Sequence, residues 1–274
     1  MPEPDKHVAE RLKFAVEIAR EAGDMTLRHF RRADLQVDRK ADSSPVTVAD
    51  RSAEELLRAR IQNRFETDGI IGEEFGEVVG KSSFKWILDP IDGTKSFIHG
   101  VPLYTTLVAV LRDSAPQVGV VHAPAVGETV WAAKGGGCWY QPAAHAEPRA
   151  ARVSEIATLN ESLLLTTEVA SFTTYRNPDA MTAFLTLQNA ARLTRTWGDG
   201  FGYLMVATGR AEIMIDPAMN IWDAAPLQTI IEEAGGIFSD WQGNPTIDAG
   251  EAVATNGRVS EEVLAVTRKF ERRV

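Results

Sequence analysis

The sequence contains a single cysteine, Cys138, and no long apolar run. One cysteine cannot form an internal disulfide and has no second cysteine for a zinc or redox motif, so we expect Cys138 to be a buried or turn-flanking structural thiol. No apolar stretch approaches the roughly 20 residues that a membrane-spanning helix needs. The opening residues, Met-Pro-Glu-Pro-Asp, lack the charged and apolar regions of a signal peptide, and we therefore expect a cytoplasmic protein without a membrane partner.

Positive charge is also scarce, with 29 Lys and Arg residues against 38 Asp and Glu residues and a formal net charge of -9. This balance argues against a nucleic-acid partner, whose binding would need a basic patch. The five histidines include no pair at the helical spacing of metal ligands, which disfavours a zinc hydrolase. Carboxylates must therefore provide most of any metal binding, and an anionic substrate would need bound cations to offset the acidic charge.

The 274 residues, 44% of them hydrophobic, can form one large domain or two modest ones. Apolar residues recur every three or four positions over residues 8–30 and again over 53–65, which predicts two helices separated by the turn cluster Asp42-Ser43-Ser44-Pro45. Short apolar runs at 70–71 and 86–88 precede acidic residues and predict strands that deliver carboxylates to a sheet edge. Residues 105–111, 117–121 and 129–133 predict an antiparallel meander that ends at three glycines.

The pattern changes after residues 141–152, which are rich in Ala, Pro and charge. Strands at 163–165, 192–197 and 211–215 are expected to alternate with helices at 178–190, 201–207, 222–233 and 259–270. We therefore divide the chain at residue 150. Residues 1–150 would form an α+β part with the metal-binding strands, and residues 151–274 an α/β part that contributes Asp223.

The densest group of functional residues is the string Trp-Ile-Leu-Asp-Pro-Ile-Asp-Gly-Thr at positions 86–94. The carboxylates of Asp89 and Asp92 and the backbone carbonyl of Ile91 are oxygen ligands of the kind that hard divalent cations prefer. Gly93 and Thr94 are expected to begin a helix whose free N–H groups would receive a phosphate, with Asp92 as a further candidate for its cap. Alone, the last three residues would be an ordinary turn with an N-cap.

Two further carboxylates are unremarkable when each is considered alone. Glu73 follows the apolar run 69–71, where a solvated loop charge is the commoner interpretation. Asp223 lies in the first turn of the helix that Trp222 opens, where an aspartate usually caps the helix. Their order along the chain, before and after the string at 86–94, is what makes them candidates for the same metal site.

These segments together resemble the inositol monophosphatase family. The resemblance is carried by Gly72-Glu73-Glu74, by residues 89–94, by Trp222-Asp223-Ala224-Ala225 with residues 233–236, and by residues 44–50, and so it spans nearly the whole chain. It implies an α/β fold of alternating αβαβα layers with the active site between the two halves. It also implies a homodimer, and Mg²⁺-dependent hydrolysis of a small phosphorylated metabolite that lithium would inhibit near Asp92 and Asp223.

The resemblance further implies a role for each candidate residue. Glu73, Asp89 and the Ile91 carbonyl would bind a first Mg²⁺, while Asp89, Asp92 and Asp223 would bind a second, and a third, weaker site at Glu73 is left open. Thr94 and Glu73 would orient the attacking water, Asp50 would hold Thr94 by a hydrogen bond, and the amides of Gly93 and Thr94 would bind the phosphate. Two metal ions about 3.5–4 Å apart are suited to an in-line displacement at phosphorus.

The leaving group is less clearly specified. Asp216 lies at the spacing where this family often places a substrate-contacting carboxylate, although an aspartate that ends a strand before Pro217 is an equal alternative. The segments 95–97, 161–168, 198–203 and 216–217 resemble the branch that hydrolyses histidinol phosphate. Histidinol phosphate is therefore the favoured substrate and inositol monophosphate the alternative. A non-catalytic regulatory protein that binds metal and phosphorylated metabolites is the competing hypothesis from another class.

Overall fold

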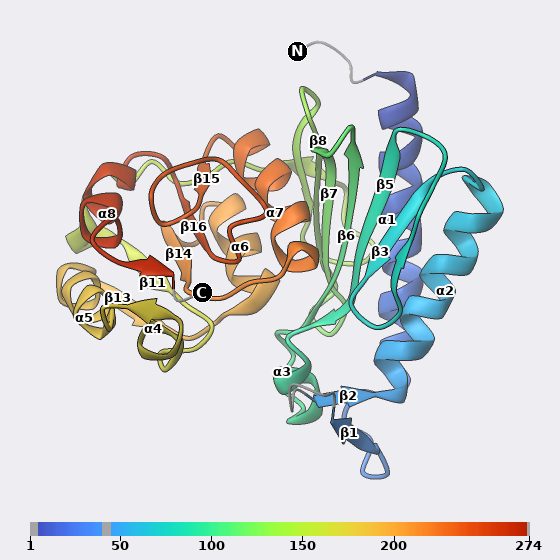
Figure 1. The fold of residues 1–274 in the computed structure, drawn as a ribbon, viewed down its shortest axis with the longest axis horizontal. Helices are drawn as coiled ribbons and strands as arrows, with labels where there is room; N and C mark the ends of the chain where they lie inside the picture. The colour runs from blue at the N-terminus through green and yellow to red at the C-terminus, as the bar shows by residue number, and fades with distance from the viewer. Residues whose placement is uncertain (1–4, 40–44, 273–274) are drawn as a thin grey trace.

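The computed structural model describes residues 5–39 and 45–272, and its elements form five layers (Figure 1). A pair of helices, an eight-stranded sheet, a second pair of helices, a five-stranded sheet and an outer group of helices follow one another across the molecule. This arrangement confirms the expected αβαβα layering. Residues 42–44 of the predicted turn cluster, and the first four residues, lie outside the described part of the chain. Within the described part, no helix is long and apolar enough to span a bilayer.

The first layer consists of α1 (Lys6–Leu27) and α2 (Val48–Arg64), as the apolar spacing predicted. Ile18 of α1 and Ile61 of α2 are fully buried and belong to one core cluster with Trp86 and Val110 of the adjacent sheet. α1 ends three residues earlier than expected, because the N–H groups of residues 28–30 make turn contacts there instead of continuing the helix. This packing fixes α2 rigidly against the strand that carries the central carboxylates.

The eight-stranded sheet has the order β10-β9-β8-β7-β6-β5-β3-β4. Its strands are β3 (Gly69–Gly72), β4 (Gly76–Val78), β5 (Phe84–Asp92), β6 (Thr105–Arg112), β7 (Ala115–Ala123), β8 (Glu128–Ala133), β9 (Gly137–Gln141) and β10 (Arg149–Ala150). The antiparallel meander is confirmed and continues past the three glycines into β9, where Cys138 is buried. The carboxyl end of β3 lies beside the middle of β5 because these two strands pair in parallel, with Gly72 opposite Leu88.

The central helices are α6 (Asp199–Ala207) and α7 (Ile221–Glu233), and they pack between the two sheets (Figure 1). One core cluster joins Leu107 and Val121 of the first sheet, Leu204 and Ile230 of these helices, and Met214 of the second sheet. The proposed boundary at residue 150 coincides with the end of β10. The two parts nevertheless share this core, so that neither is expected to bury its apolar surface alone.

The five-stranded sheet has the order β13-β11-β14-β16-β15. It consists of β11 (Leu163–Leu165), β13 (Leu193–Arg195), β14 (Ile213–Asp216), β15 (Ile237–Ser239) and β16 (Ala252–Thr255), and α4 (Ser171–Thr174), α5 (Met181–Ala190) and α8 (Ser260–Thr267) cover its outer face. The remaining elements are β1 (Val37–Arg39), β2 (Pro45–Thr47), β12 (Arg176–Asn177), β17 (Glu271–Arg272) and the short 3-10 helix Leu159–Glu161.

Several boundaries in this half differ from the prediction. The helix expected at 178–190 begins only at Met181, since residues 178–180 form the turn that leads into it, and the last helix ends at Thr267 rather than at 270. The strand expected at 192–197 is limited to the three residues that pair with β11. β15 and β16 were not predicted, because each is a short apolar run between turns without a clear period.

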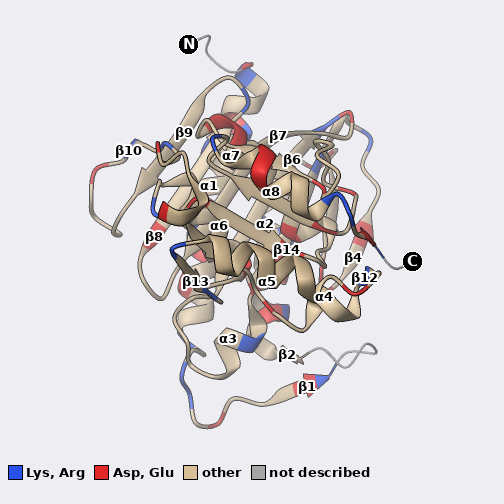
Figure 2. Ribbon diagram, turned by 90° about the vertical axis from the view of Figure 1, so that its left-hand side faces the viewer, with Lys and Arg blue, Asp and Glu red and all other residues tan. Residues whose placement is uncertain are grey.

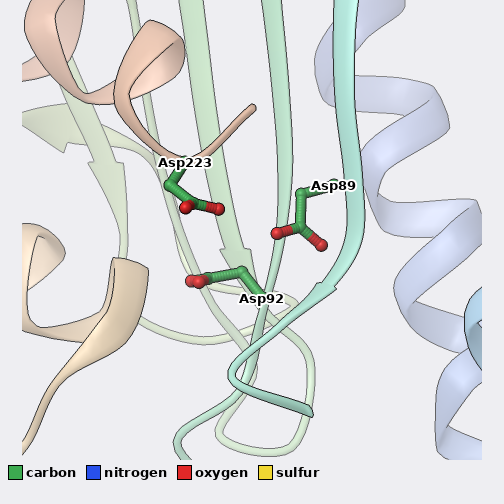
Figure 3. Close-up of side chains that lie close together, drawn as sticks. All are labelled: Asp89, Asp92 and Asp223. Carbon is green, nitrogen blue, oxygen red and sulfur yellow. The ribbon is translucent and has the colours of Figure 1, made fainter. Parts of the chain in front are cut away.

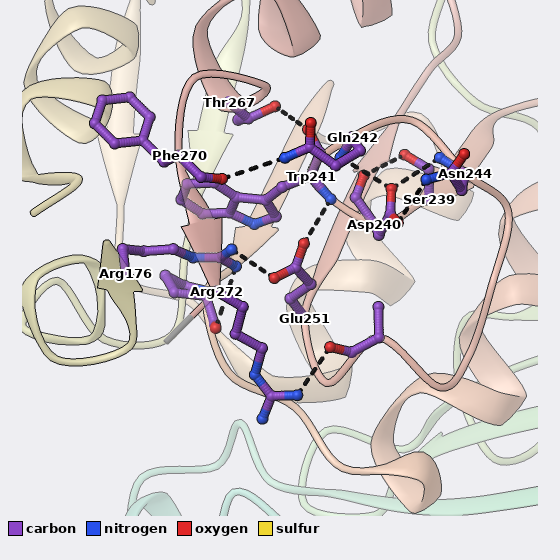
Figure 4. Close-up of polar contacts among 12 residues, drawn as sticks. Arg176, Ser239, Asp240, Trp241, Gln242, Asn244, Glu251, Thr267, Phe270 and Arg272 are labelled. Carbon is purple, nitrogen blue, oxygen red and sulfur yellow. Dashed lines mark hydrogen bonds and ion pairs between the residues drawn. The ribbon is translucent and has the colours of Figure 1, made fainter. Parts of the chain in front are cut away.

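A buried ion pair joins distant parts of this second half (Figure 4). The guanidinium of Arg176, which is fully buried, lies 2.5 Å from a carboxylate oxygen of Glu251 and 3.7 Å from the centre of the Trp241 ring. Its Nη2 also donates a hydrogen bond to the carbonyl of Pro217 at 3.2 Å. Arg176 therefore connects the outer layer to the loop that leads from β14 into α7.

Candidate metal and phosphate site

Three carboxylates from both halves of the chain meet at one point (Figure 3). Asp89 and Asp92 come from β5 and Asp223 from the first turn of α7, and one oxygen of each lies within 4.8 Å of the others. Asp89 is a residue within β5 rather than at its end, and the pairing of β5 with β6 shifts register between Asp89 and Asp92. This irregularity accompanies the approach of two side chains that are three positions apart in one strand.

The electrostatics of this cluster favour a bound cation. Burial raises the pKa of Asp89 well above its usual value, and the charges of Glu73, Asp92 and Asp223 raise it further. Burial likewise raises the pKa of Asp92 to about 6, and burial together with the charge of Asp92 raises that of Asp223. Like charges held together out of water are stabilised by a counter-charge, and an all-oxygen donor set fits a hard divalent cation such as Mg²⁺.

Glu73 lies beside this cluster in the turn that follows β3. Its backbone N–H donates to the carbonyl of Leu88 at 3.2 Å, and its carboxyl group lies close enough to Asp89 to raise the pKa of that residue. The parallel pairing of β3 with β5 is the reason for this proximity. The carbonyl of Ile91 accepts a hydrogen bond from Thr94 Oγ1 at 3.0 Å, and its residue lines the same cavity as Glu73 and Asp89.

The helix expected after the carboxylates is present as α3 (Thr94–Ile98). The expectation that Asp92 caps it was wrong. Gly93 is the N-cap residue, and its φ of +83° lies in the left-handed region that glycine tolerates. No side chain donates or accepts a capping hydrogen bond at this helix start. The Oδ2 atom of Asp92 instead accepts hydrogen bonds from Thr105 Oγ1 at 2.6 Å and from the Gly200 N–H at 2.5 Å.

Asp50 lies on the other side of α3, at the start of α2. Its Oδ2 accepts hydrogen bonds from the N–H and the hydroxyl of Thr47 at 2.7 and 2.6 Å, which forms a capping box for α2. Its Oδ1 lies 3.4 Å from Thr94 Oγ1. The pKa of Asp50 is raised by burial, while the Thr47 hydrogen bonds act in the opposite direction. The structure therefore brings Asp50 and Thr94 together, as the resemblance implied.

Asp223 combines the two interpretations that the sequence left open. Its Oδ2 accepts a hydrogen bond from the Asn220 N–H at 2.8 Å, which closes a capping box at the start of α7. The same carboxylate contributes an oxygen to the three-aspartate cluster. Capping and metal binding are compatible here because a carboxylate has two oxygens and several lone pairs.

The structure places Asp216 at the end of β14, before Pro217, which is the alternative to substrate contact that the sequence left open. The side chain lies outside the set that lines the cavity, and the residue is only 4% exposed. One oxygen accepts a hydrogen bond from the Thr167 N–H and the other from the Tyr203 hydroxyl, both at 3.0 Å. Because the side chain does not line the cavity, this geometry counts against the predicted contact with the leaving group.

A different carboxylate lines the cavity near the cluster. The sequence analysis included Asp199 only as part of the segment 198–203 and predicted no role for it. It has φ of +54°, its backbone N–H donates to Thr167 Oγ1 at 2.9 Å, and a Cβ on Gly93 would lie 2.7 Å from its Oδ2. Burial raises its pKa well above the usual value, and the charge of Asp92 raises it further. The one feature of the sequence that could have indicated a functional role for Asp199 is its position between two glycines at a helix start.

The cavity beside the aspartate cluster has a volume of about 540 Å³. Metal-site candidates line one part of it, and the first residues of α3 line another. Glu168 and Lys95 lie on its exposed side with 3.4 Å between their charged groups. Basic and acidic residues are otherwise interspersed over the side of the molecule that Figure 2 shows. The volume suits a small metabolite.

Comparison with known proteins gives a consistent result. The family described as the inositol monophosphatase family matches residues 7–272. The histidinol-phosphatase of Chlorobaculum parvum is 41% identical, over 95% of this chain and 98% of that protein, and the histidinol-phosphatase of Mycobacterium tuberculosis is 38% identical, over 92% and 96%. Among solved structures, the Thermotoga maritima IMPase superposes with a TM-score of 0.83 at 30% identity, and an inositol monophosphatase from Zymomonas mobilis with 0.81 at 30% identity. These matches cover 95% and 96% of this chain, and 97% and 99% of theirs.

Proposed function

The chain belongs to the inositol monophosphatase family, and we propose on that basis that it hydrolyses a small phosphate monoester in a reaction that depends on Mg²⁺. The observation that carries this proposal is the meeting of Asp89, Asp92 and Asp223 beside the first turn of α3. The three carboxylates provide the negative charge that binds cations. The helix start provides N–H groups for a phosphate.

We propose the metal ligands that the family resemblance implies. Glu73, Asp89 and the Ile91 carbonyl would hold one Mg²⁺, and Asp89, Asp92 and Asp223 a second, with a third, weaker site at Glu73. When bound, these ions would supply the positive charge that activates a water molecule and stabilises the leaving oxygen. Lithium is expected to inhibit by competing near Asp92 and Asp223.

The remaining residues act on the water and on the phosphate. We propose that Thr94 and Glu73 orient the attacking water and that Asp50 fixes the Thr94 hydroxyl, from which it lies 3.4 Å away. The amides of Gly93 and Thr94 would donate hydrogen bonds to phosphate oxygens. Fixed donors at this position stabilise charge that grows in the transition state without any rearrangement at the moment of reaction.

Histidinol phosphate is the proposed substrate, with inositol monophosphate as the alternative. Two relatives at 41% and 38% identity over almost their whole lengths are named histidinol-phosphatase. Asp199 and Glu168 line the cavity and would attract the ammonium group of histidinol, which an inositol ring lacks. A non-catalytic binding protein is disfavoured because metal binding alone would not require the Asp50–Thr94 contact. A cytoplasmic homodimer completes the proposal.

The experiment is a phosphate-release assay on the purified protein. Histidinol phosphate and inositol 1-phosphate are compared side by side with saturating Mg²⁺, with Ca²⁺ in its place, and with a chelator. We expect turnover with Mg²⁺ only, and a higher kcat/KM for histidinol phosphate. Turnover that survives the chelator would refute the metal mechanism, and the absence of turnover on both substrates would favour the binding protein.

A further inference from the structure

We propose that Glu54, a fully buried residue of α2, is a positioning residue that holds the turn carrying Glu73 in its place beside the metal site. The inference rests on the function proposed above, because it assigns a purpose to the location of Glu73. Glu54 touches neither the aspartate cluster nor the cavity. It acts on the backbone of the residues that follow Glu73.

The Glu54 carboxylate is the acceptor at the centre of this turn. Its Oε2 accepts a hydrogen bond from the Glu74 N–H at 2.8 Å, and its Oε1 accepts one from the Phe75 N–H at 3.2 Å. Arg58, one helical turn further along α2, donates from Nε to Glu54 Oε1 at 2.7 Å and from Nη2 to the carbonyl of Gly76. The turn between β3 and β4 is thus held by two side chains of one helix.

A buried carboxylate needs compensation, and here the turn and Arg58 provide it. The carboxylate of Glu54 lies close to the backbone of Gly72, since a Cβ added to Gly72 would fall 2.1 Å from Glu54 Oε1. Gly72 pairs with Leu88, the residue before Asp89, so the Glu54 carboxylate lies against the place where β3 and β5 pair and bring Glu73 beside Asp89. A hydrogen bond lost at this point would free the backbone of the two residues after Glu73.

The spacing along α2 extends the argument to the reaction. Asp50, Glu54 and Arg58 are four residues apart, so that they share one face of the helix. Asp50 reaches Thr94 and Glu54 reaches the turn of Glu73, and these are the two residues proposed to orient the attacking water. α2 itself is fixed in the core by Leu57 and Ile61. One rigid helix therefore sets the separation of Thr94 from Glu73.

The test is the variant Glu54→Gln. Glutamine keeps the shape but has one acceptor oxygen and turns an NH₂ group toward donors, so at least one backbone N–H loses its partner. Mg²⁺ affinity is measured by calorimetry on the protein without substrate. Exchange of the Glu74 and Phe75 amide hydrogens is measured in the metal-free protein. We expect Mg²⁺ affinity to fall about 10-fold to 100-fold, as it does when partners of metal ligands are removed, and both amides to exchange faster.

Two controls separate positioning from a general loss of stability. Glu55→Gln makes the same change of charge at the neighbouring, exposed position of α2. Ile61→Val loosens the buried face of the same helix, and its Tm is compared with that of Glu54→Gln. Both controls are expected to leave the Mg²⁺ affinity and the two amides unchanged. If Glu54→Gln does not fold, Glu54→Asp keeps the charge but shortens its reach and is measured in the same way.

Wild-type Mg²⁺ affinity in a folded Glu54 variant would overturn the inference, as would unchanged exchange at Glu74 and Phe75. A fall in affinity of the same size in Ile61→Val would also overturn it, because the effect would then follow stability rather than the turn. These outcomes leave the proposed function intact. Failure of the wild-type protein to bind Mg²⁺ would instead refute the proposed function and, with it, the role given to Glu54.

Discussion

The Oδ2 atom of Asp92 on β5 accepts a hydrogen bond from the backbone N–H of Gly200 on α6, with 2.5 Å between the two atoms. The two residues are 108 positions apart in the chain and belong to different halves of it. A proposed metal ligand is therefore oriented by the backbone of the other half. This contact also explains the glycine, since a Cβ at position 200 would lie 2.7 Å from Asp92 Oδ2 and 2.6 Å from Thr105 Oγ1.

Gly200→Ala is accordingly expected to weaken the proposed Mg²⁺ site. The added methyl group must displace the Asp92 carboxylate or the start of α6, so the Mg²⁺ concentration for half-maximal phosphatase activity should rise about 10-fold or more. Gly202→Ala is the matched control, because its methyl group would meet Met214 and the Trp197 carbonyl at 2.7 Å rather than Asp92. Equal Mg²⁺ requirements in the two variants would contradict this explanation.

Asp92→Asn should lose most of its turnover and remain folded. Burial raises the pKa of Asp92 to about 6, so the carboxylate is mostly ionised at pH 7 and its buried charge costs folding free energy in the metal-free protein. The asparagine oxygen can still accept from Thr105 and Gly200, and we expect thermal stability in a chelator to be unchanged or higher. In wild type, Mg²⁺ at 100 times its Kd should stabilise by about 2.7 kcal/mol. A thermal scan in which Asp92→Asn keeps that Mg²⁺-induced shift would argue against Asp92 as a ligand.

The pH dependence of stability should include a contribution from His122 on β7, whose ring Nδ1 hydrogen-bonds with the Thr129 hydroxyl. Burial, and then the charge of Arg20, lower its pKa to about 4, whereas an unfolded histidine has a pKa near 6.5. The unfolded chain therefore binds the proton first, and stability present above pH 6.5 is lost as the pH falls toward 4. At pH 5 this loss is on the order of 2 kcal/mol.

His122→Asn cannot take up that proton. Urea unfolding in a chelator at pH 7.5 and pH 5 should show a smaller loss of unfolding free energy for His122→Asn than for wild type. His145→Asn removes an exposed histidine and serves as the control. An identical pH dependence in wild type and His122→Asn would show that other groups determine acid stability.

Arg176→Met should be strongly destabilising. The change removes the cation of the buried ion pair and leaves the buried Glu251 carboxylate without a counter-charge, which typically costs about 3–5 kcal/mol. Changing Glu251→Gln as well should recover part of the loss, because no buried charge then remains unpaired. Urea unfolding of the single and double variants measures this coupling. A double variant less stable than Arg176→Met would show that the charge of Glu251 is compensated elsewhere.

Local patterns were sufficient to predict the elements that pack by a simple period. α1, α2 and the antiparallel meander follow from apolar residues at helical or strand spacing, and β3 and β5 from short apolar runs. β15 and β16 were missed because two or three apolar residues between turns do not distinguish a strand from a loop. β16 is a strand because it pairs with β14, and β15 because it pairs with β16, and both pairings are tertiary contacts.

The candidate site likewise has features that local sequence patterns predict and features that depend on tertiary contacts. The proximity of Glu73 to Asp89 follows from the parallel pairing of β3 with β5, and Asp223 was found because a family pattern linked it to them. Neither spacing nor charge revealed which oxygen of Asp92 is used by Gly200, or that both oxygens of Asp216 are engaged. Such facts depend on how side chains from different layers meet. Asp199 was overlooked for that reason, since only the fold turns it toward the cavity.

The choice of substrate can be tested at Asp199. Histidinol phosphate carries an ammonium group, and a charge-assisted hydrogen bond to it is worth about 1.5–3 kcal/mol, so Asp199→Asn should lower kcat/KM for histidinol phosphate roughly tenfold or more. Inositol monophosphate offers only hydroxyl groups, which an amide can also bind, and its kcat/KM should change much less. Asp216→Asn is the decisive comparison, because the sequence favoured Asp216 for this contact while the structure holds it between Thr167 and Tyr203. The quantity to compare, with saturating Mg²⁺, is the ratio of kcat/KM for histidinol phosphate to kcat/KM for inositol monophosphate. A ratio that falls in Asp199→Asn and stays at the wild-type value in Asp216→Asn would support Asp199 as the partner of the ammonium group. If the ratio falls only in Asp216→Asn, then Asp216, the carboxylate predicted from the sequence, contacts the substrate.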